Sequence, residues 1–196
     1  MEKISIKPAN TFCPQALFLH GTNKEDGTPN FGLFCWFSYC WDSELAVMAC
    51  IGGNKLTKDR IRTEKIFSAN LVSESLLPLA DYLGNTEGYT EGKMNIPLDV
   101  ERGRVLDVPV LKESPWIFEL EVRGEHALKG SDVFFCKIRN TLAAKELKKP
   151  AIGLDKKMQL CSPVLWTSSG KHGDYFSINK SSIGATKSLK ETFSKQ

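Results

Sequence analysis

Long apolar runs, an export signal and a large excess of either charge are all missing from this chain of 196 residues. No stretch approaches the roughly 18–20 apolar residues that a membrane span requires, and the first residues lack the apolar core of a signal peptide. The 26 basic and 23 acidic residues leave a net charge of +3, too small an excess to indicate a nucleic-acid partner. We therefore expect a cytoplasmic globular protein that folds as one domain over residues 1–196.

Recognisable catalytic and metal-binding motifs are scarce as well. The six cysteines show no C-x-x-C spacing and no histidine at ligand spacing, so the sequence predicts no metal site. Without an export signal the thiols are expected to be reduced, with a redox pair as the alternative. No G-x-S-x-G elbow and no carboxylate pair accompany the three histidines, which disfavours a hydrolase but does not exclude a triad assembled from distant positions.

The charge is distributed unevenly along the chain. Residues 145–196 contain ten lysines and no arginine against four acidic residues. This pattern is typical of a solvated, Lys-rich tail around residues 180–196. The alternative is a basic rim that attracts an anionic ligand.

Strand patterns dominate the first half of the chain. Apolar residues 16–20 and 31–40 flank a segment rich in turn formers, with Asp26-Gly27 at its centre, and this arrangement predicts a β-hairpin. Residues 44–51 predict a third strand, which is continuously apolar from Leu45 and so is expected to be buried on both faces. A short charged helix is expected over 55–65, followed by a strand over 67–71.

Further along, a second helix is expected with Ser75 as its N-cap, Pro78 in its first turn and Gly84 at its end. Residues 85–103 are rich in glycine and predict an irregular segment. The remaining strands are expected at 105–111, 116–123, 132–138, around 158–166 and around 175–178, and the alternation in 116–123 predicts a half-buried strand. Many strands with two short helices indicate a small β-barrel whose ends are covered by helices.

The turn Gly52-Gly53-Asn54-Lys55-Leu56-Thr57 carries the first functional signal. A buried strand passes through two glycines directly into a helix, where free N–H groups and the helix dipole favour a phosphate. The Thr57 hydroxyl and nearby Lys and Arg residues would add to this preference. The spacing differs from a Walker loop. A plain strand-to-helix turn with a solvated basic face is the alternative.

The second signal is the aromatic segment 33–41, which holds Phe34, Trp36, Phe37, Tyr39 and Trp41. It is interpreted either as aromatic core or as a flat apolar slot for a planar ring system.

The order of these segments resembles the flavoredoxin branch of the flavin-reductase-like proteins. The resemblance rests on a co-linear set of motifs: 14–19 and 26–30 as an opening hairpin, the strand with Trp36, the turn 54–57, Phe67-Ser68-Ala69-Asn70, Ser73-Glu74, 79–84, and Gly88 to Lys93. It covers residues 14–94 well and 115–140 loosely, and Gly173-Asp174-Tyr175-Phe176 resembles a closing aromatic strand.

That resemblance implies a mainly β protein, namely an FMN-binding split β-barrel of Greek-key-like topology with a few short helices, which dimerises with FMN near the subunit interface. By position, Phe34, Cys35 and Trp36 would lie along the isoalloxazine ring, with Ser38 and Tyr39 close by. By the same comparison of positions, Asn54, Lys55 and Thr57 would bind the phosphate. Lys93 would close the site from the same or the partner subunit.

The chain departs from the family pattern at three positions. Leu33 replaces a hydroxyl residue before the ring-facing segment, Gly92 replaces the acid before the loop lysine, and Asp132 stands where reductases of the wider family tend to have a His near the flavin. A carboxylate there would repel an anionic nucleotide and so puts nicotinamide-dependent reduction in doubt. The alternative is that Asp132 begins a strand in solvent.

The resulting hypothesis is a homodimeric, flavoredoxin-like redox protein that uses FMN to pass electrons from a reduced donor, NAD(P)H or a redox protein, to an acceptor. An NAD(P)H:flavin oxidoreductase that releases reduced FMN is the first alternative. A non-enzymatic flavin- or haem-binding carrier or sensor is the second.

Overall fold

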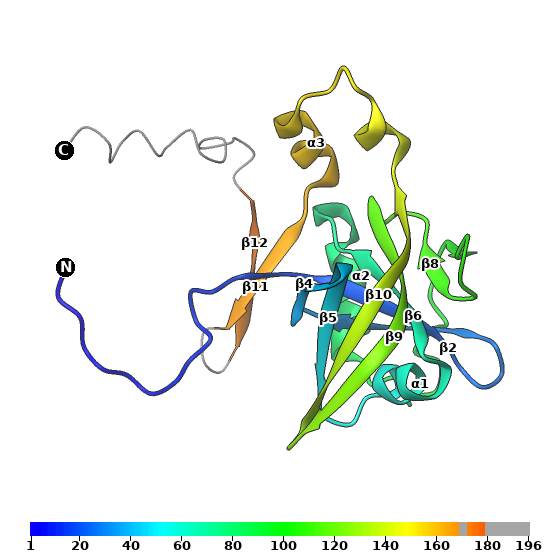
Figure 1. Ribbon diagram of the computed structural model, residues 1–196, viewed down its shortest axis with the longest axis horizontal. Helices are drawn as coiled ribbons and strands as arrows, with labels where there is room; N and C mark the ends of the chain where they lie inside the picture. Colours follow the sequence, from blue (N-terminus) through cyan, green and yellow to red (C-terminus); the bar gives the residue numbers. More distant parts are fainter. Residues whose placement is uncertain (169–171, 179–196) are drawn as a thin grey trace.

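The fold is built around one antiparallel sheet of seven strands. The computed structural model describes residues 1–168 and 172–178, so the predicted Lys-rich tail at 180–196 lies outside the described residues. The strand order is β3-β2-β6-β9-β10-β5-β4, and the sheet curls into a barrel (Figure 1). Its strands are β2 Phe18–Asn23, β3 Pro29–Phe34, β4 Phe37–Asp42, β5 Glu44–Gly52, β6 Ile66–Leu71, β9 Trp116–Leu128 and β10 Ser131–Ala143. The predicted mainly β split barrel is therefore confirmed.

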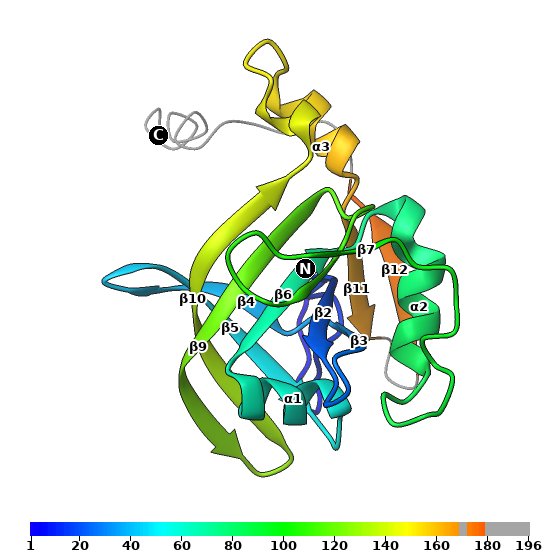
Figure 2. The same cartoon turned by 90° about the vertical axis from the view of Figure 1, so that its right-hand side faces the viewer.

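Short helices and two small sheets surround this barrel. The helices are α1 Leu56–Glu64, α2 Leu77–Asn85 and α3 Leu154–Cys161, with single 3₁₀ turns at Glu74–Leu76 and Lys145–Lys148. The strands β1 Gln15–Ala16, β11 Val164–Ser168 and β12 Gly173–Ser177 form one small sheet, and β7 Val100–Arg102 pairs with β8 Pro109–Leu111. α1 lies at one end of the barrel, while α2 and the β11–β12 hairpin lie along the same side (Figure 2).

Within the described ranges, no helix has the length and apolar character needed to cross a membrane.

The predicted aromatic strand at 31–40 is wrong in one respect, because it is two strands. β3 ends at Phe34 and β4 begins at Phe37. Between them the Phe37 N–H donates to the Cys35 carbonyl at 2.9 Å, and the Cys50 N–H donates to the Trp36 carbonyl at 2.8 Å. β3 and β4 form the two outer edges of the seven-stranded sheet, and only two residues join them. The sheet must therefore curl until its edges meet at this corner.

Burial of β5 also differs from the prediction. Val47, Ala49 and Ile51 are fully buried in the barrel, but Met48 and Cys50 on the opposite face remain partly exposed. The apolar run alone did not distinguish these two faces. The half-open face borders the cavities described below.

Three later predictions are corrected by the structure. The segment 116–123 is buried on both faces from Ile117 to Leu120, because Val108 and Val110 pack against Ile117 from outside. The strand expected around 158–166 begins only at Val164, and the residues before it form α3. The second helix contains Pro78 in its first turn as predicted, but it starts from a 3₁₀ turn and ends one residue beyond Gly84.

Glu119 is a fully buried carboxylate, and its surroundings explain why it is tolerated. Its oxygens accept hydrogen bonds from the N–H groups of Arg104, Val105 and Leu106 at 2.9, 2.8 and 2.6 Å. The Asn140 amide donates a fourth at 2.7 Å. Burial alone would raise the pKa of Glu119, but these donors outweigh it and lower the pKa. The carboxylate thereby ties the 103–107 loop to the barrel.

His20 is buried with neither ring nitrogen hydrogen-bonded to the part of the chain that the structure describes. Its ring lies 4.9 Å from that of Phe34, 5.1 Å from Phe67 and 5.8 Å from Phe37. Burial in this aromatic cluster lowers the pKa of His20 from 6.5 to about 3. The folded protein therefore holds a neutral imidazole beneath the end of β3.

We predict that replacing His20 by Leu flattens the pH dependence of stability. Below pH 6.5 the unfolded chain binds a proton that folded His20 does not, so the native protein loses stability as the pH falls from 6.5 towards 3. Between pH 7.5 and 5, urea unfolding should show a drop about 2 kcal/mol larger for the native protein than for His20→Leu. Identical pH profiles would contradict a neutral buried His20.

Candidate functional site

The turn after β5 positions the start of α1. Gly53 has φ +71°, a conformation that favours glycine, and its N–H donates to the Gly130 carbonyl at 2.9 Å. Lys55 occupies the N-cap position, and no side chain of the described residues caps the helix. Within this part of the chain, the N–H groups of the first turn thus lack a side-chain acceptor. Asn54, predicted to bind phosphate, is exposed and does not border either cavity described next.

A narrow cleft of about 30 Å³ lies at this helix start and brings together Lys55, Thr57 and Lys93. The Thr57 hydroxyl oxygen accepts a hydrogen bond from the Asn30 amide at 3.0 Å. The Lys93 ammonium donates to the Phe31 carbonyl at 2.9 Å. All three predicted residues come from one chain, so Lys93 reaches this cleft without a partner subunit.

Glycines allow the backbone to approach the cleft closely. A Cβ atom on Gly32 would lie 2.7 Å from the Thr57 hydroxyl oxygen, and one on Gly88 would lie 2.7 Å from the Leu56 Cβ. Larger residues at either position would displace the side chains at the helix start.

The cleft is electropositive and partly shielded from water. Burial lowers the pKa of Lys93 to about 8, an effect that Glu87 opposes. Lys55 pairs with Glu87, with 2.8 Å between the ammonium and carboxylate atoms. At neutral pH Lys93 therefore carries most of its positive charge.

A larger cavity of about 320 Å³ adjoins this cleft, since Leu33, Phe34 and Lys55 line both. The predicted ring-binding residues Phe34, Cys35 and Trp36 border it. The other residues that line it are Leu17, Leu33, Cys50, Gly52, Lys55, Trp166 and Tyr175. An aromatic slot and a cationic cleft thus lie next to each other.

Trp166 and Tyr175 are site residues that the motif analysis missed. They are directly paired across β11 and β12, and both border the larger cavity. The Tyr175 hydroxyl donates to Asp81 at 2.5 Å, and burial, followed by this bond, raises its pKa to about 12. A Cβ on Gly173 would lie 2.0 Å from the Trp166 indole nitrogen, so glycine is required opposite that ring. The available signal was one aromatic residue in each of the two strands predicted around 158–166 and 175–178.

Two predicted ring neighbours lie outside this cavity because they belong to β4. Ser38 faces a neighbouring cavity, and Tyr39 is 58% exposed with its ring edge against Phe118 at 6.2 Å. The break at Cys35–Trp36 separates both residues from the end of β3.

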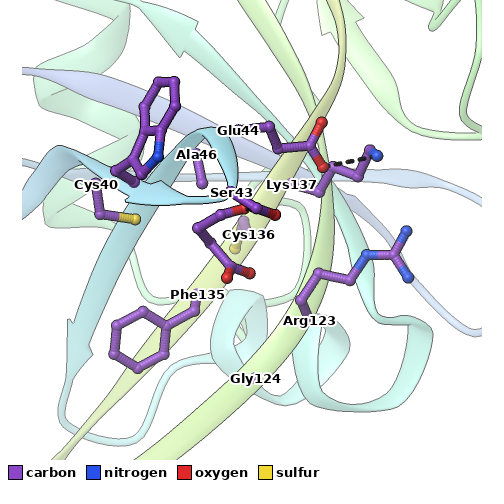
Figure 3. A pocket seen from close by; sticks show the side chains of 11 residues that line it. Cys40, Ser43, Glu44, Ala46, Arg123, Gly124, Phe135, Cys136 and Lys137 are labelled. Carbon is purple, nitrogen blue, oxygen red and sulfur yellow. Dashed lines mark hydrogen bonds and ion pairs between the residues drawn. The ribbon is translucent and has the colours of Figure 1, made fainter.

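A further cavity lies elsewhere, over β4, β5, β9 and β10 (Figure 3). It measures about 620 Å³, and no predicted cofactor-binding residue borders it. The Lys137 ammonium lies 2.7 Å from the Glu44 carboxylate across it (Figure 3). The charges of Lys137 and Glu44 in this cavity thus compensate each other.

Asp132 neither begins a strand in solvent nor carries an unopposed charge. It is buried, with one oxygen 3.2 Å from the Lys58 ammonium and 2.6 Å from the Arg62 guanidinium. Burial alone would raise its pKa, but the bonds from Lys58 and Arg62 lower it. The expectation that this carboxylate repels an anionic nucleotide loses its physical basis, because two cations compensate it.

The fold and these cavities define a split-barrel protein with a cationic cleft beside an aromatic slot. The family described as "Flavin reductase like domain" matches residues 11–173, so the chain belongs to the flavin-reductase-like family. This assignment confirms the resemblance and indicates a flavin-related redox role. A comparison with curated protein sequences gives no match.

Solved structures with the same fold include two flavoredoxins. The flavoredoxin from Methanosarcina acetivorans is 20% identical, covering 98% of this chain and 100% of its own, with a TM-score of 0.83. The flavoredoxin of Desulfovibrio vulgaris (Miyazaki F) is 21% identical, with 95% and 99% coverage and a TM-score of 0.80. An FMN-binding protein from Thermus thermophilus with bound p-hydroxybenzaldehyde is 18% identical, with 94% and 98% coverage and a TM-score of 0.73.

We predict that Asp132→Asn destabilises the protein by about 3 kcal/mol at pH 7, because it leaves Lys58 without its buried counter-ion. Asp107→Asn is the matched control, since Asp107 pairs with Arg102 at 2.7 Å on the surface, and it should cost less than about 1 kcal/mol. The lowered pKa of Asp132 means that this stabilisation persists above about pH 4 and is lost as the pH falls through the folded pKa. Equal effects of the two substitutions in urea unfolding would contradict the ion-pair assignment.

Proposed function

We propose that this protein is an FMN-binding redox flavoprotein that passes electrons between a reduced donor and an acceptor, as in flavoredoxin-like electron transfer. The observation that carries the proposal is that an aromatic cavity of about 320 Å³ adjoins a cationic cleft at the start of α1, where Leu33, Phe34 and Lys55 line both. A flavin mononucleotide has the matching parts, a planar ring system and one phosphate.

Lys55, Thr57 and Lys93 would hold the phosphate. The N–H groups at the start of α1 add an electropositive end, which no side chain of residues 1–168 and 172–178 caps. Asn30 already donates to the Thr57 oxygen, which leaves the Thr57 hydroxyl proton available for a phosphate oxygen. A single cleft of this kind suits FMN better than a dinucleotide, and the Thermus thermophilus relative is itself described as FMN-binding.

Phe34, Cys35 and Trp36 would line one side of the ring system, with Trp166 and Tyr175 on the C-terminal hairpin. These side chains orient a planar group and exclude water from it, while Asp81 fixes the Tyr175 hydroxyl. The flavin would supply the electron-transfer chemistry. Asn54, Ser38 and Tyr39 are left out of this set because they do not border the cavity.

NAD(P)H:flavin oxidoreductase activity is the second candidate. It gains support from Asp132, whose charge is compensated by Lys58 and Arg62 and so does not repel a nucleotide. Bleaching of the flavin by NADH or NADPH would favour this reading, whereas reduction by a redox protein alone favours the first.

A homodimer is part of the proposal. Aromatic side chains around β4 remain exposed, with Trp36 at 49%, Tyr39 at 58% and Trp41 at 76%. Leu45 and Phe135 on the neighbouring strands are 53% and 41% exposed. Such a concentration of apolar surface suits a symmetric interface with a second copy. Because Trp36 also borders the aromatic cavity, this interface would include the flavin site.

FMN and riboflavin titrations, followed by quenching of flavin fluorescence, test the cofactor site. Thr57→Val and Lys55→Ala should each weaken FMN binding about tenfold or more and riboflavin less than threefold, since a charge-assisted hydrogen bond contributes about 1.5–3 kcal/mol. Thr63→Val on the exposed face of α1 is the matched control for threonine. Lys112→Ala removes a surface ion pair of the same 2.8 Å length as the Lys55 pair and is the control for lysine. Equal losses for both flavins would reject this phosphate site, and no FMN binding at micromolar concentration would reject the proposed function.

Light scattering on the full chain should give the mass of a dimer. Trp41→Ser, which removes the most exposed of these aromatic groups, should shift the equilibrium towards monomer at micromolar concentration. The control Phe176→Ser alters an exposed aromatic residue on β12. A monomeric native protein that still binds FMN would contradict the dimer.

A further inference from the structure

Three consecutive residues of β3 support the cleft at the start of α1 from behind. The Asn30 amide donates to the Thr57 hydroxyl oxygen at 3.0 Å, and the Phe31 carbonyl accepts from the Lys93 ammonium at 2.9 Å. The third residue, Gly32, leaves room for the Thr57 side chain, since a Cβ there would lie 2.7 Å from the Thr57 oxygen. One strand thus sets the positions of two of the groups that would bind the phosphate.

Asn30 lies behind Thr57 and does not border the cleft itself. It is directly paired with Thr22 across β2 and β3, and its amide also donates to the Thr22 hydroxyl oxygen at 3.2 Å. The exposed fractions of Asn30, Thr22 and Thr57 are 0, 1 and 3%. Because water has so little access to this group, the amide decides which way the two hydroxyls point.

The side-chain oxygen of Asn30 is a buried acceptor that has no hydrogen-bond partner in the described ranges. The loop after α2 covers it, since a Cβ on Gly88 would lie 3.4 Å away. An unpaired buried acceptor is rare and lowers stability. The stability of the barrel therefore does not by itself explain an asparagine at this position.

Asn70 on β6 shows the contrasting arrangement, although it is just as buried. Its amide donates to the Leu19 carbonyl at 2.9 Å and to the Ser68 hydroxyl at 2.8 Å, and its oxygen accepts from the Leu111 N–H at 2.9 Å. Both polar ends of Asn70 are thus bonded within the fold. Of Asn30, only the donor end is.

We propose that Asn30 is a positioning residue that keeps the Thr57 hydroxyl as a donor to the phosphate of the flavin. The inference rests on the proposed function, because the phosphate is that of the FMN assigned to this cleft. An amide NH₂ group can only donate, so the Thr57 oxygen accepts from it and the Thr57 proton remains for an anion. Turned by 180°, the amide would present its oxygen, take the Thr57 proton and leave only lone pairs towards the phosphate.

A double-mutant cycle on the full chain tests whether Asn30 acts through Thr57. Asn30→Leu keeps the branched outline of the side chain without its polar groups, and it should weaken FMN binding at least fivefold and riboflavin binding less than twofold. In a Thr57→Val background the same substitution should weaken FMN binding less than twofold, because the hydroxyl through which Asn30 acts is gone. Quenching of flavin fluorescence gives the four affinities for each flavin.

Asn70→Leu is the matched control, since it removes an equally buried amide that does not border the cleft. It breaks hydrogen bonds at both polar ends, so it should lower the urea midpoint of unfolding more than Asn30→Leu does. The ratio of FMN to riboflavin affinity should stay within twofold of the native value.

Asn30→Asp is a second variant, which keeps the shape of the side chain and serves if Asn30→Leu does not fold. Its carboxylate imitates the turned amide, because it accepts from the Thr57 hydroxyl instead of donating to it. FMN binding should weaken at least tenfold and riboflavin binding less than twofold.

FMN affinities within twofold of native in the Asn30 variants would overturn the positioning role. An equal loss from Asn30→Leu with and without the Thr57 hydroxyl would overturn it as well. A protein that loses FMN affinity on Thr57→Val but not on changes of Asn30 retains the proposed phosphate site. A native protein that binds no FMN at micromolar concentration overturns the proposed function, and the assignment of Asn30 falls with it.

Discussion

The rest of the fold depends on the two-residue corner at Cys35–Trp36. The strands on either side of it are the opposite edges of the seven-stranded sheet, so covalent continuity forces those edges together. β3 and β4 are not paired with each other. Aromatic packing closes the corner instead, with the Phe37 ring 4.4 Å from that of Phe18 and 5.8 Å from His20. The barrel is therefore split between β3 and β4, where several aromatic side chains lie. The split leaves room for the cavities beside Phe34 and Trp36.

The cations at the start of α1 fall into two groups. Lys55 and Lys93 border the cleft, whereas the buried carboxylate of Asp132 pairs with Lys58 and Arg62. The helix therefore divides its cations between structure and ligand binding. Arg62 and Lys58 belong to the fold, because their removal would leave a buried charge unpaired. Lys55 and Lys93, which border the cleft, are the cations placed to meet an anion there.

Buried polar groups in this barrel follow two different physical solutions. Glu119 keeps its charge because three backbone N–H groups and Asn140 satisfy it. His20 has no such partner among the residues that the structure describes, and burial keeps it neutral by lowering its pKa to about 3. The hydrogen bonds to Glu119 fix a loop outside the sheet. The neutral ring of His20 keeps the aromatic cluster beneath Phe34 free of charge. This suits an apolar cavity, because a charged imidazole there would have no partner in surroundings of low dielectric constant.

Local patterns in the sequence determined the opening hairpin, β5, α1 and β6, since turn chemistry and hydrophobic periodicity are properties of neighbouring residues. They also identified the two functional segments, and Phe34, Cys35, Trp36, Lys55, Thr57 and Lys93 do meet around adjoining cavities. Only the tertiary structure decided that the aromatic run breaks at Cys35–Trp36, that Ser38 and Tyr39 leave the slot, and that Trp166 and Tyr175 enter it. It also gave Asp132 its cationic partners and Glu119 its burial. Each of these outcomes depends on segments distant in the chain, and contacts of that kind leave no periodic signal in the residues that make them.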